Sequence, residues 1–212
     1  MRIAVVNETS AGDKNPYIIE ALQGYGHTVI NAGMQKSGGS PELTYIETGF
    51  ISALLLNAGR ADFIVGGCGT GQGFLNSALQ YPGVFCGLIT KPLDAWLFSR
   101  INNGNCISLA LNQGYGWAGE INLKFIFEKL FAGEAGEGFP ESRRTSQQAS
   151  RERLVQISAL THRPFAEIVR GLNPEIPRRA ISFPGIEEIL DIATLDDLEL
   201  KSALQNCRPI AG

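Results

Sequence analysis

The sequence has no long hydrophobic run and no strong excess of charge of either sign. Of its 212 residues, 18 are lysine or arginine and 21 are aspartate or glutamate, so the formal net charge at pH 7 is −3. This balance offers no basic surface for nucleic acid or for an anionic membrane. The apolar run at the N-terminus is too short for a signal peptide, and no window approaches the ~18 apolar residues of a spanning helix. We therefore expect a cytoplasmic protein with no nucleic-acid and no membrane partner.

Cysteine and histidine are also scarce, with four cysteines and two histidines. None of the cysteines forms a CxxC pair, and no set of His, Asp or Glu has metal-ligand spacing, so we predict no metal and no cofactor. Cys86 and Cys106 lie within apolar runs, which is typical of buried and inert thiols. Cys68 differs from them because it lies in a glycine-rich segment.

The first 132 residues alternate short apolar runs with amphipathic ones, within a composition that is 44% hydrophobic and 18% charged. The expected strands cover residues 3–6, 27–30, 61–65, 84–89 and 106–111, and the expected helices cover 15–25, 44–58, 92–101 and 115–132. This order predicts a doubly wound, Rossmann-like α/β fold with a parallel five-stranded sheet. Ligands of such sheets bind beyond the carboxyl ends of the strands, so the chemistry is expected in the loops there.

The pattern changes after this α/β region. Residues 133–150 are polar and glycine-rich and either end the compact α/β unit or wrap over it, and helices are expected over 151–171, interrupted near Pro164, and over 186–206. We therefore divide the chain into an α/β domain over 1–144 and a C-terminal helical extension over 145–212. The positions expected to be buried in the last helix are Leu190, Ile192, Leu195, Leu198 and Leu204. Trp96 and Trp117 are expected in the core, within helices.

Residues 66–73, which read GGCGTGQG, are the most informative segment. A strand is expected to end at Val65 and a helix to begin near Gly71. Glycines between them let the backbone turn sharply and approach a ligand, and a helix N-terminus favours an anion. The same field favours a sulfur anion at Cys68, and the Thr70 hydroxyl can bond a ligand oxygen. The alternative is a plain glycine turn with a small cysteine packed beneath it.

Part of this segment, CGTGQG at residues 68–73, resembles the CGTGxG loop of the type B ribose-5-phosphate isomerase and galactose-6-phosphate isomerase family. Tyr45 lies at the start of the second expected helix, close to where the family has a tyrosine. Residues 102–105 resemble the family's Asn-Asp-x-Asn before the fifth strand. Arg143 and Arg144 follow the last helix as the family's basic motif does. The resemblance covers roughly residues 1–144.

The resemblance implies an isomerase that interconverts aldose and ketose phosphates through an enediolate without a metal. It implies Cys68 and Thr70 as catalytic residues, with Cys68 as the base. The implied substrate-binding residues are Glu8, Thr9, Tyr45, Gly69, Gly71, Gln72, Gly73, Asn102, Arg143 and Arg144. The arginines would bind the phosphate, with the partner subunit as one source, because family sites lie at a dimer interface. A homodimer or a dimer of dimers is therefore expected.

Three positions depart from the family pattern. Thr9 replaces a histidine that binds phosphate, Ile101 replaces the histidine that opens the sugar ring, and Asn112 replaces an arginine. The substrate is then an open-chain sugar phosphate, or Glu8 or His162 supplies the acid, or catalysis has been lost. We expect an isomerase of the ribose-5-phosphate or galactose-6-phosphate type.

The alternative function is a non-catalytic protein that binds a sugar phosphate or another anion with the same loop. A nucleotide-binding domain is less favoured, because Asn31 stands at the end of the second strand where an acidic residue would contact a ribose.

Overall fold

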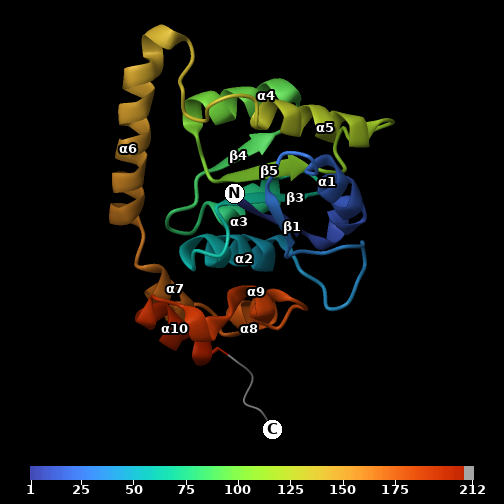
Figure 1. The fold of residues 1–212 in the computed structure, drawn as a ribbon. Coiled ribbons are helices and arrows are strands. Elements are labelled where there is room, and N and C mark those ends of the chain that lie inside the picture. Colours follow the sequence, from blue (N-terminus) through green and yellow to red (C-terminus); the bar gives the residue numbers. More distant parts are fainter. Residues whose placement is uncertain (208–212) are drawn as a thin grey trace.

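A computed structural model describes residues 1–207, and one parallel five-stranded sheet forms its centre (Figure 1). The strands are β1 (Arg2–Asn7), β2 (Thr28–Asn31), β3 (Phe63–Cys68), β4 (Cys86–Ile89) and β5 (Cys106–Ala110). Their order in the sheet is β2-β1-β3-β5-β4, and every neighbouring pair is parallel. The predicted fold class is confirmed.

The three central strands end at nearly the same level, which positions the loops that follow them. Asn7 of β1 is in register with Gly67 of β3, and Cys68 of β3 is in register with Ala110 of β5. β3 is buried along its whole length because helices cover both faces of the sheet. The loops after β1, β3 and β5 therefore meet at the end of the sheet formed by the carboxyl ends of the strands, which we call the carboxyl edge. The opposite end, where the strands begin, is the amino edge.

Five helices cover the two faces of the sheet (Figure 1). On one face lie α1 (Asn15–Ala21), α4 (Pro92–Leu97) and α5 (Gly119–Leu130), and on the other lie α2 (Tyr45–Asn57) and α3 (Gln72–Ala78). Alternate residues of β1 serve the two faces, as strand geometry requires: Ile3 packs in the cluster under α1 and α5, and Ala4 packs in the cluster under α2.

The two tryptophans have different surroundings. Trp117 precedes α5 and is 100% exposed, so its prediction as a core residue within a helix was wrong. The segment from 115 to 118 contains a glycine with positive φ and ends in Ala118, which is also left-handed, so the helix begins later than its apolar pattern indicated. Trp96 lies in α4, half-buried between Phe139 and Arg100.

The C-terminal part consists of η3 (Glu141–Arg143), α6 (Arg144–Thr161), α7 (Phe165–Gly171), α8 (Glu175–Ile181), α9 (Ile186–Leu190), η4 (Ile192–Thr194) and α10 (Leu198–Gln205). α6 begins at Arg144, earlier than the predicted start at residue 151, and the interruption predicted near Pro164 is confirmed, because α6 ends at Thr161 and α7 begins at Phe165. No residue of α6 is buried, and the helix stands beside the sheet as an arm (Figure 1). Because its first turns have no apolar side to pack, they have the composition of a loop.

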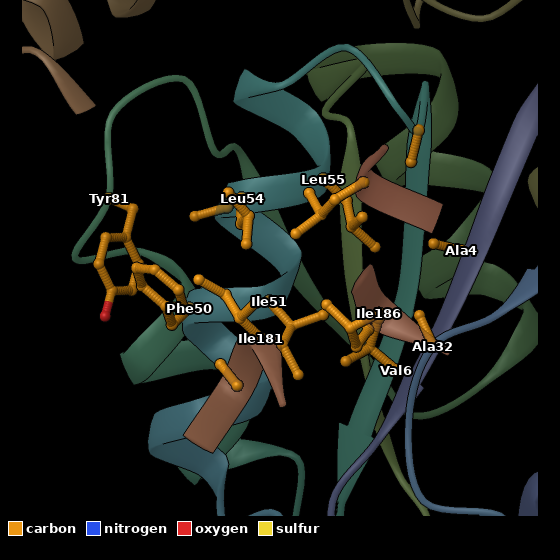
Figure 2. Packing of buried hydrophobic residues seen from close by; sticks show 14 of the residues in the cluster. Ala4, Val6, Ala32, Phe50, Ile51, Leu54, Leu55, Tyr81, Ile181 and Ile186 are labelled. Carbon is orange, nitrogen blue, oxygen red and sulfur yellow. The ribbon is translucent and has the colours of Figure 1, made fainter. Parts of the chain in front are cut away.

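The last helices cover the outer face of α2. α2 is apolar on nearly all sides, so it needs cover from a second direction besides the sheet. Ile181 of α8 and Ile186 of α9 lie beside Ile51 of α2 (Figure 2), and all three belong to one hydrophobic cluster. The rings of Phe50 and Phe165 stack with centroids 5.8 Å apart. The division at residue 144 stays a prediction, but the extension shares a core with the α/β region.

A side-chain clamp adds to this contact. Arg60, just after α2, donates from Nε to the carbonyl of Leu190 at 2.7 Å and from Nη2 to the carbonyl of Asp191 at 3.0 Å and to Thr194 Oγ1 at 2.6 Å. Four of the five leucine and isoleucine positions predicted to be buried are buried. The exception is Leu198, the first residue of α10, which is 74% exposed.

Candidate active site

The turn between β3 and α3 is built on glycines, as predicted, but it begins later. Gly66 and Gly67 pair with β5 within the sheet, so β3 runs to Cys68 and not to Val65. A Cβ on Gly66 would collide with the buried ring of Phe74, so a residue that is usual in loops is required here inside a strand. The turn itself is confined to Gly69, Thr70 and Gly71.

Gly71 fixes the direction of this turn. Its φ is 75°, and a Cβ there would lie 2.6 Å from Leu88 Cδ1, so glycine is required for both reasons. The Ser108 hydroxyl of β5 donates to the Gly71 carbonyl at 2.6 Å. The helix that follows, α3, begins at Gln72 as expected and has seven residues.

Cys68, the proposed base, lies at the end of β3. Its residue is 5% exposed, and it packs in the cluster on the α2 side of the sheet together with Phe74. The carbonyl of Cys68 accepts a hydrogen bond from the Leu111 amide at 3.0 Å. The thiol is therefore mostly buried at the end of β3, whereas Thr70, two residues further on, is exposed.

Glu8 and Ser10 approach this turn from β1. Glu8 is 8% exposed, and its amide donates to the Gly67 carbonyl at 3.1 Å. Its Oε2 accepts from the Ser10 amide at 3.0 Å and from the Ser10 hydroxyl at 2.5 Å, which caps η1 (Thr9–Lys14). Ser10 Oγ in turn accepts from the Gly69 amide at 3.0 Å. The Glu8 carboxylate is thus one hydroxyl away from the turn.

Asn112, from the loop after β5, completes these contacts. Its Nδ2 donates to the Ser10 carbonyl at 2.8 Å, and its amide donates to the Gly69 carbonyl at 2.9 Å. We call Glu8, Ser10, Gly69 and Asn112 the edge network. Sequence reasoning did not include Ser10 at all, and it considered Asn112 only as a replaced arginine. The sole local signal for Ser10 was a Glu-x-Ser step after a strand, which is typical of a helix cap.

Tyr45 lies at the same edge. It is the first residue of α2, where a capping box between Thr44 and Glu47 begins the helix. Its side chain is 47% exposed and lies against the first turn of α3, so that a Cβ on Gly73 would come within 2.9 Å of the Tyr45 ring. Thr9 is nearby in the chain and donates its amide to the Leu43 carbonyl at 2.9 Å.

The amides expected to hold a ligand oxygen are not all free. The Gly69 amide is bonded to Ser10, and the Gln72 amide donates to Thr70 Oγ1 at 3.3 Å. Thr70 and Gln72 are exposed, and Gly73 is half-exposed. The structure thus brings together Glu8, Thr9, Tyr45 and residues 68–73.

Three predicted residues lie elsewhere. Asn102 ends η2 (Phe98–Asn102), before β5 begins, so it lies at the amino edge of the sheet. Arg143 ends η3 and Arg144 begins α6 on the same side (Figure 1), and Arg144 Nη2 is 3.6 Å from Glu137 Oε1. The five residues of β5 alone span about 16 Å. Within one chain, these three residues are therefore too far from Cys68 to touch the same sugar.

Asn102 lines a groove of about 270 Å³ between η2 and α6. Its walls are largely apolar and include Leu79, Phe85, Phe98, Leu154 and Val155.

The two histidines are also away from the edge network. His27 directly precedes β2 at the amino edge and packs on Tyr25 and Phe131, and burial lowers its pKa. His162 follows α6, with Nδ1 3.0 Å from the Ser158 carbonyl. Of the two groups considered as the missing acid, Glu8 is the one beside the turn.

The sequence matches a known family. The family model for ribose/galactose isomerases matches residues 3–144. A ribose-5-phosphate isomerase structure from Vibrio parahaemolyticus is 40% identical, with a TM-score of 0.91 over 98% of this chain and 99% of that one. A 4-deoxy-L-threo-5-hexosulose-uronate ketol-isomerase, solved with a tartrate, is 35% identical with the same TM-score and coverage. No sequence among curated proteins matches this chain.

A third structure shows how the chain differs from shorter relatives. Ribose-5-phosphate isomerase B from Clostridium thermocellum is 20% identical with a TM-score of 0.62, and the match covers 100% of that chain but 76% of this one. This chain is therefore longer, and the two more similar structures match it over nearly its full length.

These matches define the class of protein: the chain belongs to the ribose/galactose isomerase family. It is a sugar isomerase, as the resemblance of residues 68–73 implied. Within residues 1–207, no helix combines the length and apolar character needed to cross a membrane.

Proposed function

We propose that this isomerase interconverts the aldose and ketose forms of an anionic sugar through an enediolate, with Cys68 as the base at carbon. The observation that carries the proposal is the edge network. It gathers a carboxylate and a hydroxyl around the turn that directly follows Cys68, using loops from β1, β3 and β5. Such a meeting of polar groups at the carboxyl edge is where a doubly wound sheet binds ligands.

Each group has a role in this chemistry. The Cys68 sulfur carries a proton between the two adjacent carbons of the sugar. Because Cys68 is only 5% exposed, a sugar can reach it only through the opening beside Gly69, Thr70 and Gly71, which we call the mouth of the turn. The exposed Thr70 hydroxyl supports the charged oxygen of the enediolate. The Tyr45 ring, resting on Gly73, forms one wall of the mouth.

The charged group of the sugar needs a cationic side chain to bind it. The predicted arginines can provide this cation only if they come from a second copy of the chain. Asn102, Arg143 and Arg144 lie at the end of the sheet opposite to Cys68. A homodimer that sets the amino edge of one chain against the carboxyl edge of the other would complete each site. The exposed apolar residues of α6, among them Leu154, Val155 and Leu160, provide a surface for such a contact.

Mixing two inactive variants tests this shared site. Cys68→Ala and Asn102→Ala each remove one half of it, so each homodimer should be strongly impaired. After mixing in equal amounts and exchanging subunits, about a quarter of the sites contain both native halves, and about a quarter of the activity should return. Mixed samples that stay as inactive as their parents, although subunit exchange is demonstrated, would contradict the shared site.

The charged group of the sugar is a phosphate or, as the second candidate, a carboxylate. Thr9 and Ile101 are uncharged, so they neither pair with a phosphate dianion nor open a sugar ring. An open-chain sugar acid has no phosphate to bind and no ring to open, so it requires neither of the two histidines that these residues replace. The relative that is 35% identical over nearly the full chain is described as a ketol-isomerase of a uronate.

An isomerisation assay distinguishes these substrates. D-ribose 5-phosphate, D-galactose 6-phosphate and 4-deoxy-L-threo-5-hexosulose uronate are incubated with the enzyme, and the product is followed by NMR. Cys68→Ala should abolish turnover and keep binding, with Cys86→Ala as the matched control. Binding of one of these sugars without turnover by the unaltered protein would favour the non-catalytic alternative and refute the proposal.

A further inference from the structure

We propose that Glu8 and Ser10 form the relay that carries a proton between the two oxygens of the enediolate. This inference rests on the proposed isomerase function and adds two residues to its mechanism. Aldose–ketose conversion moves two protons, one between carbons and one between oxygens. Cys68 accounts for the first, and a second group must account for the other.

Ser10 has the position that the second transfer requires. Its hydroxyl accepts from the amide of Gly69, the residue after Cys68, so it stands at the mouth of the turn. Ser10 is exposed, whereas Glu8 behind it is 8% exposed. A sugar oxygen at the mouth therefore meets the serine hydroxyl first, and the carboxylate through it.

The hydrogen-bond directions favour a relay over a passive contact. The Ser10 hydroxyl already donates to Glu8 Oε2, so its proton faces an acceptor while a lone pair remains for a sugar hydroxyl. The Ser10 amide donates to the same carboxylate oxygen and holds it in place. This bonding combines a mobile proton with a buried base.

Other hydroxyls and carboxylates at this edge are arranged differently. Thr70 Oγ1 accepts from the Gln72 amide. The carboxylate of Glu47 accepts from the Thr44 amide and hydroxyl and begins α2. Glu8 and Ser10 also begin a helix, η1, but Ser10 Oγ in addition accepts from the Gly69 amide and so connects a carboxylate to the turn.

The proposed step balances as follows. Cys68 takes the proton from C2, the C1=C2 bond forms, and the electron pair of the carbonyl moves to O1. The O2 hydroxyl then gives its proton to Ser10 Oγ while Ser10 passes its own proton to Glu8. Return of a proton through Ser10 to O1, and of the carbon proton from Cys68 to C1, gives the ketose and restores all three residues.

Hydrogen exchange separates the two transfers. The enzyme is incubated in D₂O with the three sugars named above, and NMR measures both deuterium entry at carbon and net isomerisation. Ser10→Ala should lower kcat for isomerisation by about a hundredfold or more, with a much smaller change in exchange at carbon and in KM. Ser10→Thr keeps the hydroxyl and should recover most of the activity. Ser37→Ala, which removes another serine hydroxyl bonded to a carboxylate, should have no effect.

Glu8→Gln provides a second variant that keeps the shape of the side chain. It should show the same separation of exchange from isomerisation. Equal loss of exchange and isomerisation in both variants, or unchanged isomerisation, would overturn the relay. The proposed function fails separately, if Cys68→Ala still exchanges or if the unaltered enzyme exchanges none of the three sugars.

Discussion

Phe165 tests whether the C-terminal helices and the sheet fold as one unit. Its ring is 6% exposed and begins α7, where it stacks on Phe50 of α2 at 5.8 Å and meets the edge of Tyr81 at 6.1 Å. Phe165→Ala would leave a cavity at this contact, between a helix of the extension and two aromatic residues of the α/β region. The substitution therefore weakens both parts at once if they share a core.

The expected size follows from the burial. Replacing a buried phenylalanine with alanine costs about 3–5 kcal/mol, to which the aromatic contacts contribute. That is a large fraction of the ~5–15 kcal/mol by which a folded chain is stable. For a chain of this size, each kcal/mol lowers the Tm by about 2–4 °C, so we expect the Tm to fall by roughly 6–20 °C.

Two optical signals make the result decisive. Far-UV circular dichroism reports on all helices, whereas fluorescence of the half-buried Trp96 reports on the α/β region. If the core is shared, Phe165→Ala lowers the urea midpoint of both signals together. Phe125→Ala, the same change at a residue that is 51% exposed, should leave both nearly unchanged. A fluorescence midpoint that stays in place while part of the dichroism is lost earlier would refute the shared core.

Three further predictions concern single contacts. Arg60→Ala removes three hydrogen bonds to the extension and should cost about 1.5–3 kcal/mol in urea unfolding, with little rescue by Arg60→Lys, because one amine cannot reach all three acceptors. Hydrogen bonds from Arg2 lower the pKa of Asp62 to about 2, so the stability from this exposed pair is present above the ordinary pKa near 3.8 and is lost as pH falls towards 2. Asp62→Asn should therefore cost less than about 1 kcal/mol at pH 7 and much less at pH 2, where part of the carboxylate is protonated, and a cost that is independent of pH would contradict this. Burial, with a hydrogen bond to Cys86, raises the pKa of Cys106 well above its usual value. Of these two cysteines, a thiol-reactive disulfide reagent should therefore label Cys86 before Cys106, and it should label Cys106 only on unfolding, as mass spectrometry can show.

The sheet was predictable because its signal is local. Each central strand is an apolar run bounded by polar segments, and each run is separated from the next by enough residues for a helix. The end of β3 was misplaced because Gly66 and Gly67 have loop composition, although they pair with Ser108 and Leu109 in the sheet. Glycine is required at these positions because a Cβ on Gly66 would meet the ring of Phe74 and a Cβ on Gly67 would meet the backbone of β5. These contacts are tertiary, so the local sequence does not predict them.

The edge network could not be found in this way. The Ser10–Gly69 contact joins residues 59 positions apart, and the Ser10–Asn112 contact joins residues 102 positions apart. The family motif led to the prediction of Cys68 and Thr70 as catalytic residues because both lie in one short segment. Ser10 has no such motif, and its role depends on the register that sets the ends of β1 and β3 side by side.

The extension also reaches the active-site edge through the first turn of α2. Arg179 of α8 donates to the Glu42 carbonyl at 3.0 Å, and its Nε lies 3.5 Å from Glu47 Oε1. Glu47 is 5% exposed and belongs to the capping box that begins α2, whose first residue, Tyr45, rests on Gly73. A buried carboxylate shared by a helix cap and an arginine is held more firmly than either contact alone would hold it, because each fixes its orientation for the other. The extension therefore does more than cover α2, since it helps to fix the first turn of the helix that carries Tyr45, a residue of the proposed site.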